Sequence, residues 1–253
     1  MEIGVTVGGS LDRVDRVGTE FDFVELSIGE GELDTAAHEP EAVRERVGDG
    51  ELLVHLPFQQ VLATASPEIN EAIVAYYDRL LTWAGRAGAR KATLHATSRD
   101  PHDVPQRDVV RSQLRAIRES AERNGVELVF ENVDHVSHGL PTSVLGDVAR
   151  DTDTSVCFDV GHAYLAEDHD GMERFLGHHG ERVTHLHVHD VRRRGDTHLP
   201  LGAGEIEFER VVDALPDFDG TVAIEVFTDD VWILHDTAKR VANAFDEEFL
   251  TIG

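Results

Sequence analysis

The densest chemistry in the sequence lies at positions 183–204, VTHLHVHDVRRRGDTHLPLGAG, where imidazoles and carboxylates crowd together. The stretch opens with the pattern of a strand, because His185, His187 and His189 fall on one face and mostly apolar residues fall on the other. Asp196 and His198 follow an arginine-rich segment. A lone histidine is usually a surface residue, but this crowding suits a hard or borderline divalent metal ion and predicts a metal site.

The composition is strongly acidic. Among 253 residues, Asp and Glu number 49 against 23 for Lys and Arg, which gives a formal net charge of -26. This excess is similar to the halophilic surfaces of proteins adapted to high salt, with an ordinary acidic cytosolic enzyme as the alternative. The negative field opposes nucleic acid at low ionic strength.

The single cysteine, Cys157, excludes an intrachain disulfide and favours a reducing compartment. Its apolar neighbours favour core packing, since no partner base accompanies it in SVCFDV. The N-terminus lacks a signal-like pattern, and no apolar run is long enough to span a bilayer. We therefore expect a cytoplasmic protein without a membrane partner, and a homo-oligomer is compatible with these features.

Short apolar segments alternate eight times with longer segments of helical period. We predict strands at 3–7, 22–26, 52–55, 91–95, 126–131, 155–160, 183–189 and 222–226. This alternation is typical of a parallel sheet flanked by helices. Eight units in this length predict an α/β fold in which residues 1–253 form a single (β/α)8 TIM barrel domain.

Polar side chains recur where the predicted strands end. Seven of the eight strands end in a carboxylate or an imidazole: Glu25, His55, His95, Glu131, Asp159, His187 and Glu225. The residue two positions before each one shares its strand face and points into the barrel. Because barrel enzymes keep their active sites at the carboxyl ends of the strands, we expect these side chains to meet at one mouth.

The order of these motifs resembles the xylose isomerase-like barrel superfamily, which includes sugar isomerases, sugar epimerases and the endonuclease IV type of abasic-site nuclease. The resemblance covers nearly the whole chain. It rests on HLPF at 55–58, LHAT at 94–97, FEN at 130–132, FDVGHA at 158–163, HVHD at 187–190, DTHLPLGAG at 196–204 and IEVF at 224–227. This resemblance implies the same barrel fold.

The resemblance also implies a metal-dependent isomerase or epimerase that acts on a sugar or sugar phosphate. Its metal ligands would be Glu131, Asp159, His187 and Glu225, which suit Mn, Mg, Co or Zn. The metal would polarise a carbonyl and the neighbouring hydroxyl. Glu131 and Glu225 would be the catalytic residues that remove and return a proton at the adjacent carbon.

An endonuclease IV-like phosphodiesterase is the alternative implied by the same resemblance, and only this alternative implies a nucleic-acid partner. The positions matching its three zinc ions are His55, His95, Glu131, Asp159, His162, His187, Asp196, His198 and Glu225. Several departures favour the isomerase: DVGH replaces the nuclease's Asp-Thr-Cys-His, HVHD replaces His-Leu-Asn-Asp, and Phe58 replaces a tyrosine. No basic stripe accompanies the site. A non-catalytic barrel that binds metal or sugar is a lesser alternative.

Two arginines, Arg192 and Arg193, follow the histidine-rich strand. They either bind a sugar phosphate or carboxylate as the substrate anion, or lie in a solvated loop that neutralises nearby acids. Phe227 and Trp232 follow the last strand and either wall the pocket or pack in the core.

Other polar residues are expected to support the site. Glu25 either contacts the substrate or a metal-bound water, or orients His55, which is the favoured role. His185 lies one pleat below His187 and is expected to make an interior hydrogen bond to a neighbouring strand. His189 is expected to contact a metal-ligating side chain rather than the metal itself.

Overall fold

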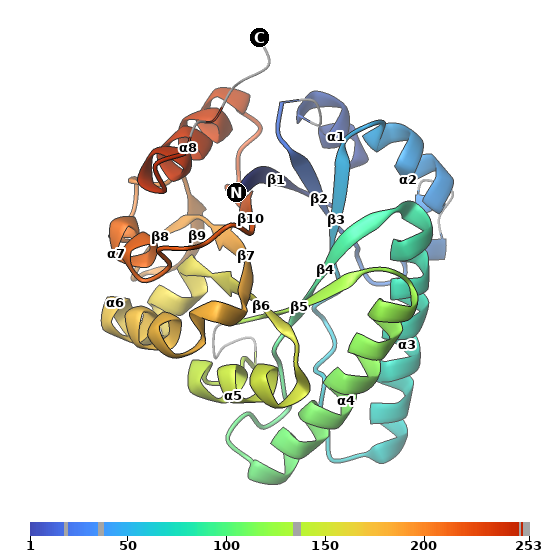
Figure 1. Ribbon diagram of the computed structural model, residues 1–253. Helices are drawn as coiled ribbons and strands as arrows, with labels where there is room; N and C mark the ends of the chain where they lie inside the picture. Colours follow the sequence, from blue (N-terminus) through green and yellow to red (C-terminus); the bar gives the residue numbers. More distant parts are fainter. Residues whose placement is uncertain (18–19, 35–37, 134–137, 248, 250–253) are drawn as a thin grey trace.

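Eight parallel strands close into a barrel in the computed structural model, in the order β1, β10, β7, β6, β5, β4, β3, β2. Helices surround this barrel (Figure 1). The structure describes residues 1–17, 20–34, 38–133, 138–247 and 249. The (β/α)8 TIM barrel expected from the alternation of strand and helix patterns is confirmed.

The barrel strands lie close to their predicted positions. Their bounds are β1 (Glu2–Gly8), β2 (Phe23–Ser27), β3 (Glu51–His55), β4 (Ala89–His95), β5 (Glu127–Glu131), β6 (Ser155–Asp159), β7 (Val183–Val188) and β10 (Thr221–Ile224). The barrel closes where β1 pairs with β10, with Val5 opposite Ile224. Parallel pairing all round brings the carboxyl ends of the strands to the same mouth.

The helices cover the outside of the barrel with their apolar faces. Their bounds are α1 (Leu11–Val17), α2 (Pro40–Val47), α3 (Pro67–Ala87), α4 (Val104–Arg123), α5 (Thr142–Thr152), α6 (Val160–His179), α7 (Phe208–Asp213) and α8 (Val231–Ala244), with short 3-10 turns η1 (Glu32–Asp34) and η3 (Gly180–Arg182). Helix α3 illustrates the pattern, since Ile73, Tyr77 and Leu80 recur at helical spacing and are buried. Burial of these faces holds the strands that position the mouth.

A small antiparallel hairpin follows β7. It consists of β8 (Asp190–Arg192) and β9 (Gly195–Leu199), and it was not among the predicted strands. Gly195 has a φ of 141°, which favours glycine at this turn. The hairpin returns the chain toward the barrel and carries Asp196 and His198 with it.

The barrel interior combines a short apolar layer with buried polar groups. The apolar layer is formed by Phe23, Leu53 and Ala223. Glu25 and His185 are fully buried in the same interior. Buried ionisable side chains are costly without partners, so these two residues require compensating contacts.

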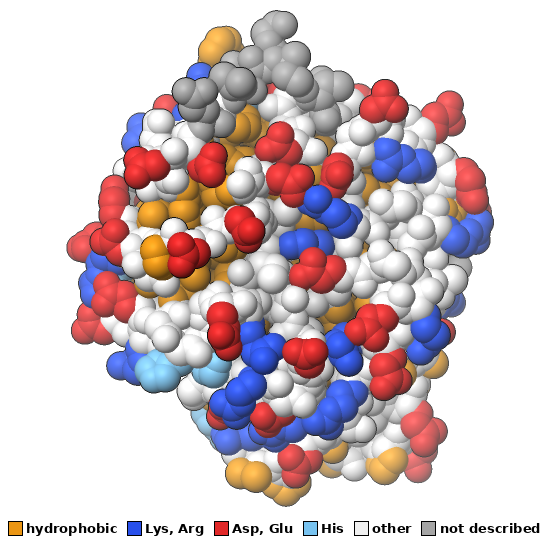
Figure 2. Space-filling view, in the orientation of Figure 1, with side chains coloured by type: hydrophobic (Ala, Val, Ile, Leu, Met, Phe, Trp, Pro, Cys, Tyr) orange, Lys and Arg blue, Asp and Glu red, His pale blue; other side chains and the backbone are white. Residues whose placement is uncertain are grey.

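The molecular surface carries acidic side chains scattered over one face, with Lys and Arg side chains among them (Figure 2). Several arginines pair with acids on their own helix, as Arg118 does with Glu122 and Arg150 with Asp147. Such exposed pairs add little stability, but they neutralise the basic groups locally. No helix in the described part of the chain has the length and apolar content needed to cross a bilayer.

Candidate functional site

The predicted site residues meet at the carboxyl end of the barrel, around a cavity of about 260 Å³. Its lining is Ser27, His55, Phe58, His95, Glu131, Val133, His162, Asp196, His198, Glu225 and Phe227. Asp159 and His187 are fully buried and contact this set. The structure therefore brings together the nine positions that were predicted as possible metal ligands, but not the predicted anion-binding residues Arg192 and Arg193.

Glu131, at the end of β5, contacts three histidines. Its Oε2 lies 3.1 Å from Nε2 of His55 and 3.2 Å from Nε2 of His95. Its Oε1 lies 3.1 Å from Nδ1 of His187. Burial raises the pKa of Glu131, but His95 and His187 outweigh burial and hold its pKa well below the usual range. The carboxylate is therefore ionised although it is buried.

A second group of side chains surrounds Asp196 on β9. Oδ2 of Asp196 lies 2.9 Å from Nε2 of His198 and 3.3 Å from Nε2 of His162. Nδ1 of His162 lies 3.5 Å from Oδ1 of Asp159. Burial lowers the pKa of His162, but Asp159 and Asp196 raise it well above its usual value. The hairpin thus adds a carboxylate and an imidazole to the mouth.

His187 on β7 joins the mouth to the barrel interior. Its Nδ1 lies 3.4 Å from Oε2 of Glu225, on the side where it also contacts Glu131. Its Nε2 lies 2.9 Å from Oε2 of Glu25. One imidazole therefore has carboxylates on both ring nitrogens.

The supporting residues differ in part from expectation. The favoured role for Glu25, orienting His55, is wrong. The Glu25 carboxylate accepts a hydrogen bond from Thr93 at 2.8 Å and contacts His187. Nδ1 of His55 instead donates to the backbone carbonyl of Leu56. The expected interior hydrogen bond of His185 is confirmed: its Nδ1 lies 2.7 Å from Oγ1 of Thr221 on β10.

The junction of β6 and α6 positions Asp159. Its side chain caps α6 by accepting a hydrogen bond from the His162 backbone N–H at 2.6 Å. Asn132, which sequence analysis did not single out, donates its side-chain amide to the Asp159 carbonyl and accepts from the Asp159 N–H. His189 contacts both Asp159 oxygens at 3.2 Å, and a Cβ on Gly161 would lie 2.1 Å from the His189 ring. These contacts explain Asn132 of the motif FEN and Asp159 and Gly161 of the motif FDVGHA.

Asp190 anchors the loop behind the hairpin. This fully buried carboxylate accepts hydrogen bonds at 2.8 to 3.1 Å from five backbone N–H groups, those of Val191, Gly202, Gly204, Glu205 and Ile206. A Cβ on Gly204 would lie 2.2 Å from Oδ1 of Asp190, so only glycine fits there. The motif LGAG is recognisable in the sequence, whereas its anchor, Asp190, becomes visible only in the structure.

Aromatic side chains border the cavity. The ring of Phe227 stacks on His198 with centroids 3.9 Å apart, and Phe58 stacks on His95 at 5.3 Å. Phe227 is 74% exposed and Phe58 is 55% exposed. Phe227 lines the cavity, which agrees with its interpretation as a pocket wall rather than a core residue. Trp232 is 82% exposed and does not line the cavity. The mouth thus offers apolar faces beside its polar floor.

Arg192 and Arg193 do not line the mouth cavity. Arg192 donates to the carbonyl of Ala203, and Arg193 pairs with Asp168 and lies over the ring of Tyr164. Binding of a substrate anion by these arginines stays a prediction.

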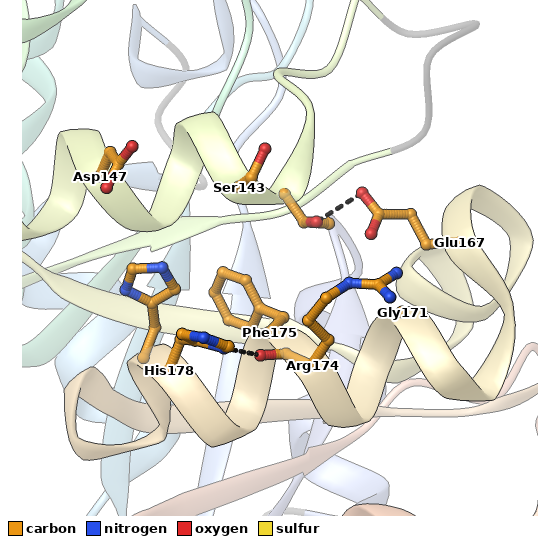
Figure 3. Close-up of a pocket in the computed structure, with 9 residues that line it drawn as sticks. Ser143, Asp147, Glu167, Gly171, Arg174, Phe175 and His178 are labelled. Carbon is orange, nitrogen blue, oxygen red and sulfur yellow. Dashed lines mark hydrogen bonds between the residues drawn. The ribbon is translucent and has the colours of Figure 1, made fainter.

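A separate cavity of about 240 Å³ lies between α5 and α6 (Figure 3). Phe175, Arg174 and His178 reach it from α6, opposite Ser143 and Asp147 of α5. None of the predicted site residues lines it. The mouth of the barrel is therefore the cavity in which the predicted chemistry is concentrated.

The donor atoms at the mouth fall into groups that fit metal ions. In each group they lie within 4.8 Å of one another, and the groups are His55, Glu131 and His187; Glu131, Asp159 and His162; Asp159, His187 and Glu225; and His189, Asp196 and His198. Nδ1 of His198 donates to the Glu225 carbonyl at 2.9 Å, so Nε2 of the neutral ring presents a lone pair to Asp196. A lone pair and a carboxylate oxygen this close need a cation between them. A proton or a divalent metal ion meets this need, and the mixed nitrogen and oxygen donors fit the metal.

Comparison with protein families agrees with the barrel fold. The family model described as "Xylose isomerase-like TIM barrel" matches residues 11–248. The chain belongs to the xylose isomerase-like TIM barrel family. Residues 11–248 include every predicted site residue.

Several solved structures are similar in fold over nearly the whole chain. A D-tagatose 3-epimerase-like protein is 21% identical with a TM-score of 0.76, and the match covers 97% of each chain. The TTHB071 protein of Thermus thermophilus, soaked with ZnCl2, is 23% identical with a TM-score of 0.72 over 94% of this chain and 97% of that chain. D-psicose 3-epimerase of Clostridium cellulolyticum H10, solved with D-tagatose, is 18% identical with a TM-score of 0.71 over 97% and 98%. At these identities the likeness shows the fold.

A curated relative is the uncharacterized protein MJ1311 of Methanocaldococcus jannaschii. It is 31% identical over 121 residues, which make up 45% of this chain and 41% of the relative. MJ1614 of the same organism is 24% identical over 124 residues, 47% of this chain and 48% of the relative. The match spans less than half the length of each relative.

Proposed function

We propose that the protein is a divalent-metal-dependent isomerase or epimerase of a sugar or sugar phosphate. The observation that carries the proposal is the placement of two carboxylates, Glu131 and Glu225, on one ring nitrogen of His187, at 3.1 and 3.4 Å. They come from β5 and from the end of β10, which are separated by two strands in the barrel. The cavity that they line, about 260 Å³, suits a small polyol. Sugar 3-epimerases of similar fold support this substrate class.

The metal would be held by Glu131, Asp159, His187 and Glu225. These three carboxylates and one imidazole supply oxygen and nitrogen donors that suit Mn, Mg, Co or Zn. When bound, the metal would polarise a carbonyl and an adjacent hydroxyl of the substrate. Burial raises the pKa of Asp159, but His162 and His189 lower it to about 2, so this ligand is ionised at neutral pH.

The proton transfer would be performed by the two glutamates. One carboxylate takes the proton from the carbon next to the carbonyl, and the other returns a proton to the opposite face. Glu225 has a side chain that is 19% exposed, whereas that of Glu131 is 1% exposed. Glu225 is therefore the more accessible of the two to a substrate, and Glu131 is held by its histidines. Phe58 and Phe227 would exclude water at the rim of the cavity.

Proton exchange with solvent tests this proposal directly. The metal-loaded protein is incubated with ketoses and ketose phosphates in deuterated water, and deuterium is measured at the carbon next to the carbonyl. We expect incorporation with at least one of these sugars, and we expect a chelator to abolish it. A metal-loaded protein that exchanges no proton in any ketose would overturn the proposal.

An endonuclease IV-like zinc phosphodiesterase is the second candidate function. The observation that favours it is the gathering of five further ligand-capable side chains around the four proposed metal ligands: His55, His95, His162, Asp196 and His198. In this function three zinc ions would activate water for attack on a phosphodiester of nucleic acid. Zinc content close to three ions per chain would favour it, and content close to one ion would favour the isomerase.

Asp196→Ala separates the two functions. We expect this substitution to abolish hydrolysis by a three-zinc centre, because Asp196 contacts both His162 and His198. It should only weaken an isomerase whose metal rests on the other strands. Both activities and the metal content are measured beside Asp49→Ala, an exposed acid in the loop between α2 and β3. Full loss of sugar proton exchange with the metal retained would contradict the assignment of ligands.

A further inference from the structure

A second cluster of metal-binding side chains lies inside the barrel, under His187. It contains Cys157 on β6, His185 on β7 and Glu25 on β2, all fully buried. The donor atoms of Cys157, His185 and His187 lie within 4.8 Å of one another. Glu25 joins them, with Oε1 at 3.8 Å from Nε2 of His185 and Oε2 at 2.9 Å from Nε2 of His187.

The hydrogen bonds of His185 show which of its nitrogens carries the proton. Nδ1 lies 3.1 Å from the carbonyl oxygen of Thr221, which can only accept, so Nδ1 is the donor. Nε2 of the neutral ring then presents a lone pair to the interior. Within the part of the chain that the structure describes, this Nε2, Nε2 of His187 and Oε2 of Glu25 have no hydrogen-bond partner. The last two atoms lie 2.9 Å apart, so a proton on Nε2 of His187 would face Oε2 of Glu25.

These atoms offer few donors to one another. The lone pair of His185 and the Oε2 atom of Glu25 are both acceptors, and the thiol of Cys157 supplies a single weak donor. A proton on Nε2 of His187 would serve Glu25 but not His185. A buried acceptor without a donor destabilises the fold. A cation among these atoms would satisfy all of them at once.

We propose that the barrel interior holds a second metal site, formed by Cys157, His185 and Glu25 beside Nε2 of His187, which binds a thiophilic divalent ion such as zinc. Sulfur, imidazole and carboxylate are the ligand mixture that zinc accepts, whereas magnesium avoids sulfur. Binding releases the thiol proton to solvent, and the thiolate and carboxylate neutralise the ion.

The interior site goes beyond the proposed reaction at the mouth and does not depend on it. An ion on Glu25 would fix the carboxylate that contacts Nε2 of His187, whose Nδ1 faces the mouth. The interior ion would thereby help to orient His187, a residue of the mouth. The sugar exchange assay does not test the interior site, which needs a separate measurement.

Cobalt substitution provides that measurement. Because Cys157 is the only cysteine of the chain, any thiolate-to-cobalt charge-transfer absorption must come from this site. The full chain, freed of metal, is titrated with Co²⁺ while its near-ultraviolet absorption and its cobalt content are recorded. We expect a charge-transfer band that saturates at one ion per chain.

Matched variants locate the band. Cys157→Ser should lose the band and lower the cobalt content by one ion per chain, and His185→Gln should weaken or abolish the band. His178→Gln, an exposed histidine of α6, is the control and should leave the band unchanged. Cobalt bound without the band, with equal content in wild type and Cys157→Ser, would overturn the proposal.

X-ray absorption of the zinc-loaded wild-type protein gives a second answer that needs no variant. A sulfur scatterer at bonding distance from zinc would support the interior site even if Cys157→Ser failed to fold. Zinc surrounded by nitrogen and oxygen alone, in protein loaded to saturation, would show that Cys157 is a packing residue.

Discussion

Glu131→Gln is expected to lower the rate of proton exchange into the sugar by about 10²- to 10⁴-fold, the contribution of a positioned acid or base. Glutamine keeps the size of the side chain and removes its negative charge. Oε2 of Glu131 faces His55 and His95, whose Nε2 atoms lie at 3.1 and 3.2 Å. The variant therefore loses the negative charge that stabilises a metal ion or a protonated imidazole beside Glu131.

The measurement is kcat and KM for deuterium incorporation, together with the metal content of the variant. Glu71→Gln, an exposed glutamate on α3, is the control and should match the wild type. Retained metal with a lost kcat would point to a role of Glu131 in proton transfer, and loss of both would point to its role as a ligand. A rate within about tenfold of the wild type, which is about 1.4 kcal/mol in activation free energy, would show that Glu131 has neither role.

The position of the mouth could be predicted because it depends on local pattern and on a rule of topology. The strand segments are recognisable from their apolar residues, and parallel strands deliver their last side chains to the same edge. His55, His95 and Glu131 are more than thirty residues apart along the chain, yet each ends its strand, and the structure places them in contact. Strand periodicity sufficed for this part of the site.

Contacts across the barrel and between loops could not be predicted in the same way. Glu25 was expected beside His55 of the adjacent strand β3, but it reaches across the interior to His187 on β7. Which side chains meet across a barrel depends on the stagger of the strands and on the size of the interior residues, and neither is visible in a local pattern. The β8–β9 hairpin was missed for a related reason, since its strands are short and neither contains a run of apolar residues.

Asp190→Ala is expected to lower the free energy of unfolding by at least about 3 kcal/mol, because each buried backbone N–H left without an acceptor costs about 1–3 kcal/mol. The Asp190 carboxylate accepts from five such groups, four of them in the segment 202–206. Asp190 is fully buried, so these N–H groups lose their acceptor at a site shielded from solvent. Denaturant unfolding, with the midpoint and slope determined for each variant, measures the change.

The control is Asp217→Ala, an exposed aspartate in the loop before β10, which should change stability by less than about 0.5 kcal/mol. Asp190→Asn should fall between the two, because one amide oxygen still accepts while the NH2 group opposes the remaining N–H donors. Asp190 also pairs with Leu199 of β9, so a loosened loop should disturb His198 and reduce metal binding at the mouth. A loss below about 1 kcal/mol for Asp190→Ala would mean that the five N–H groups find other acceptors, and the anchor would then be dispensable.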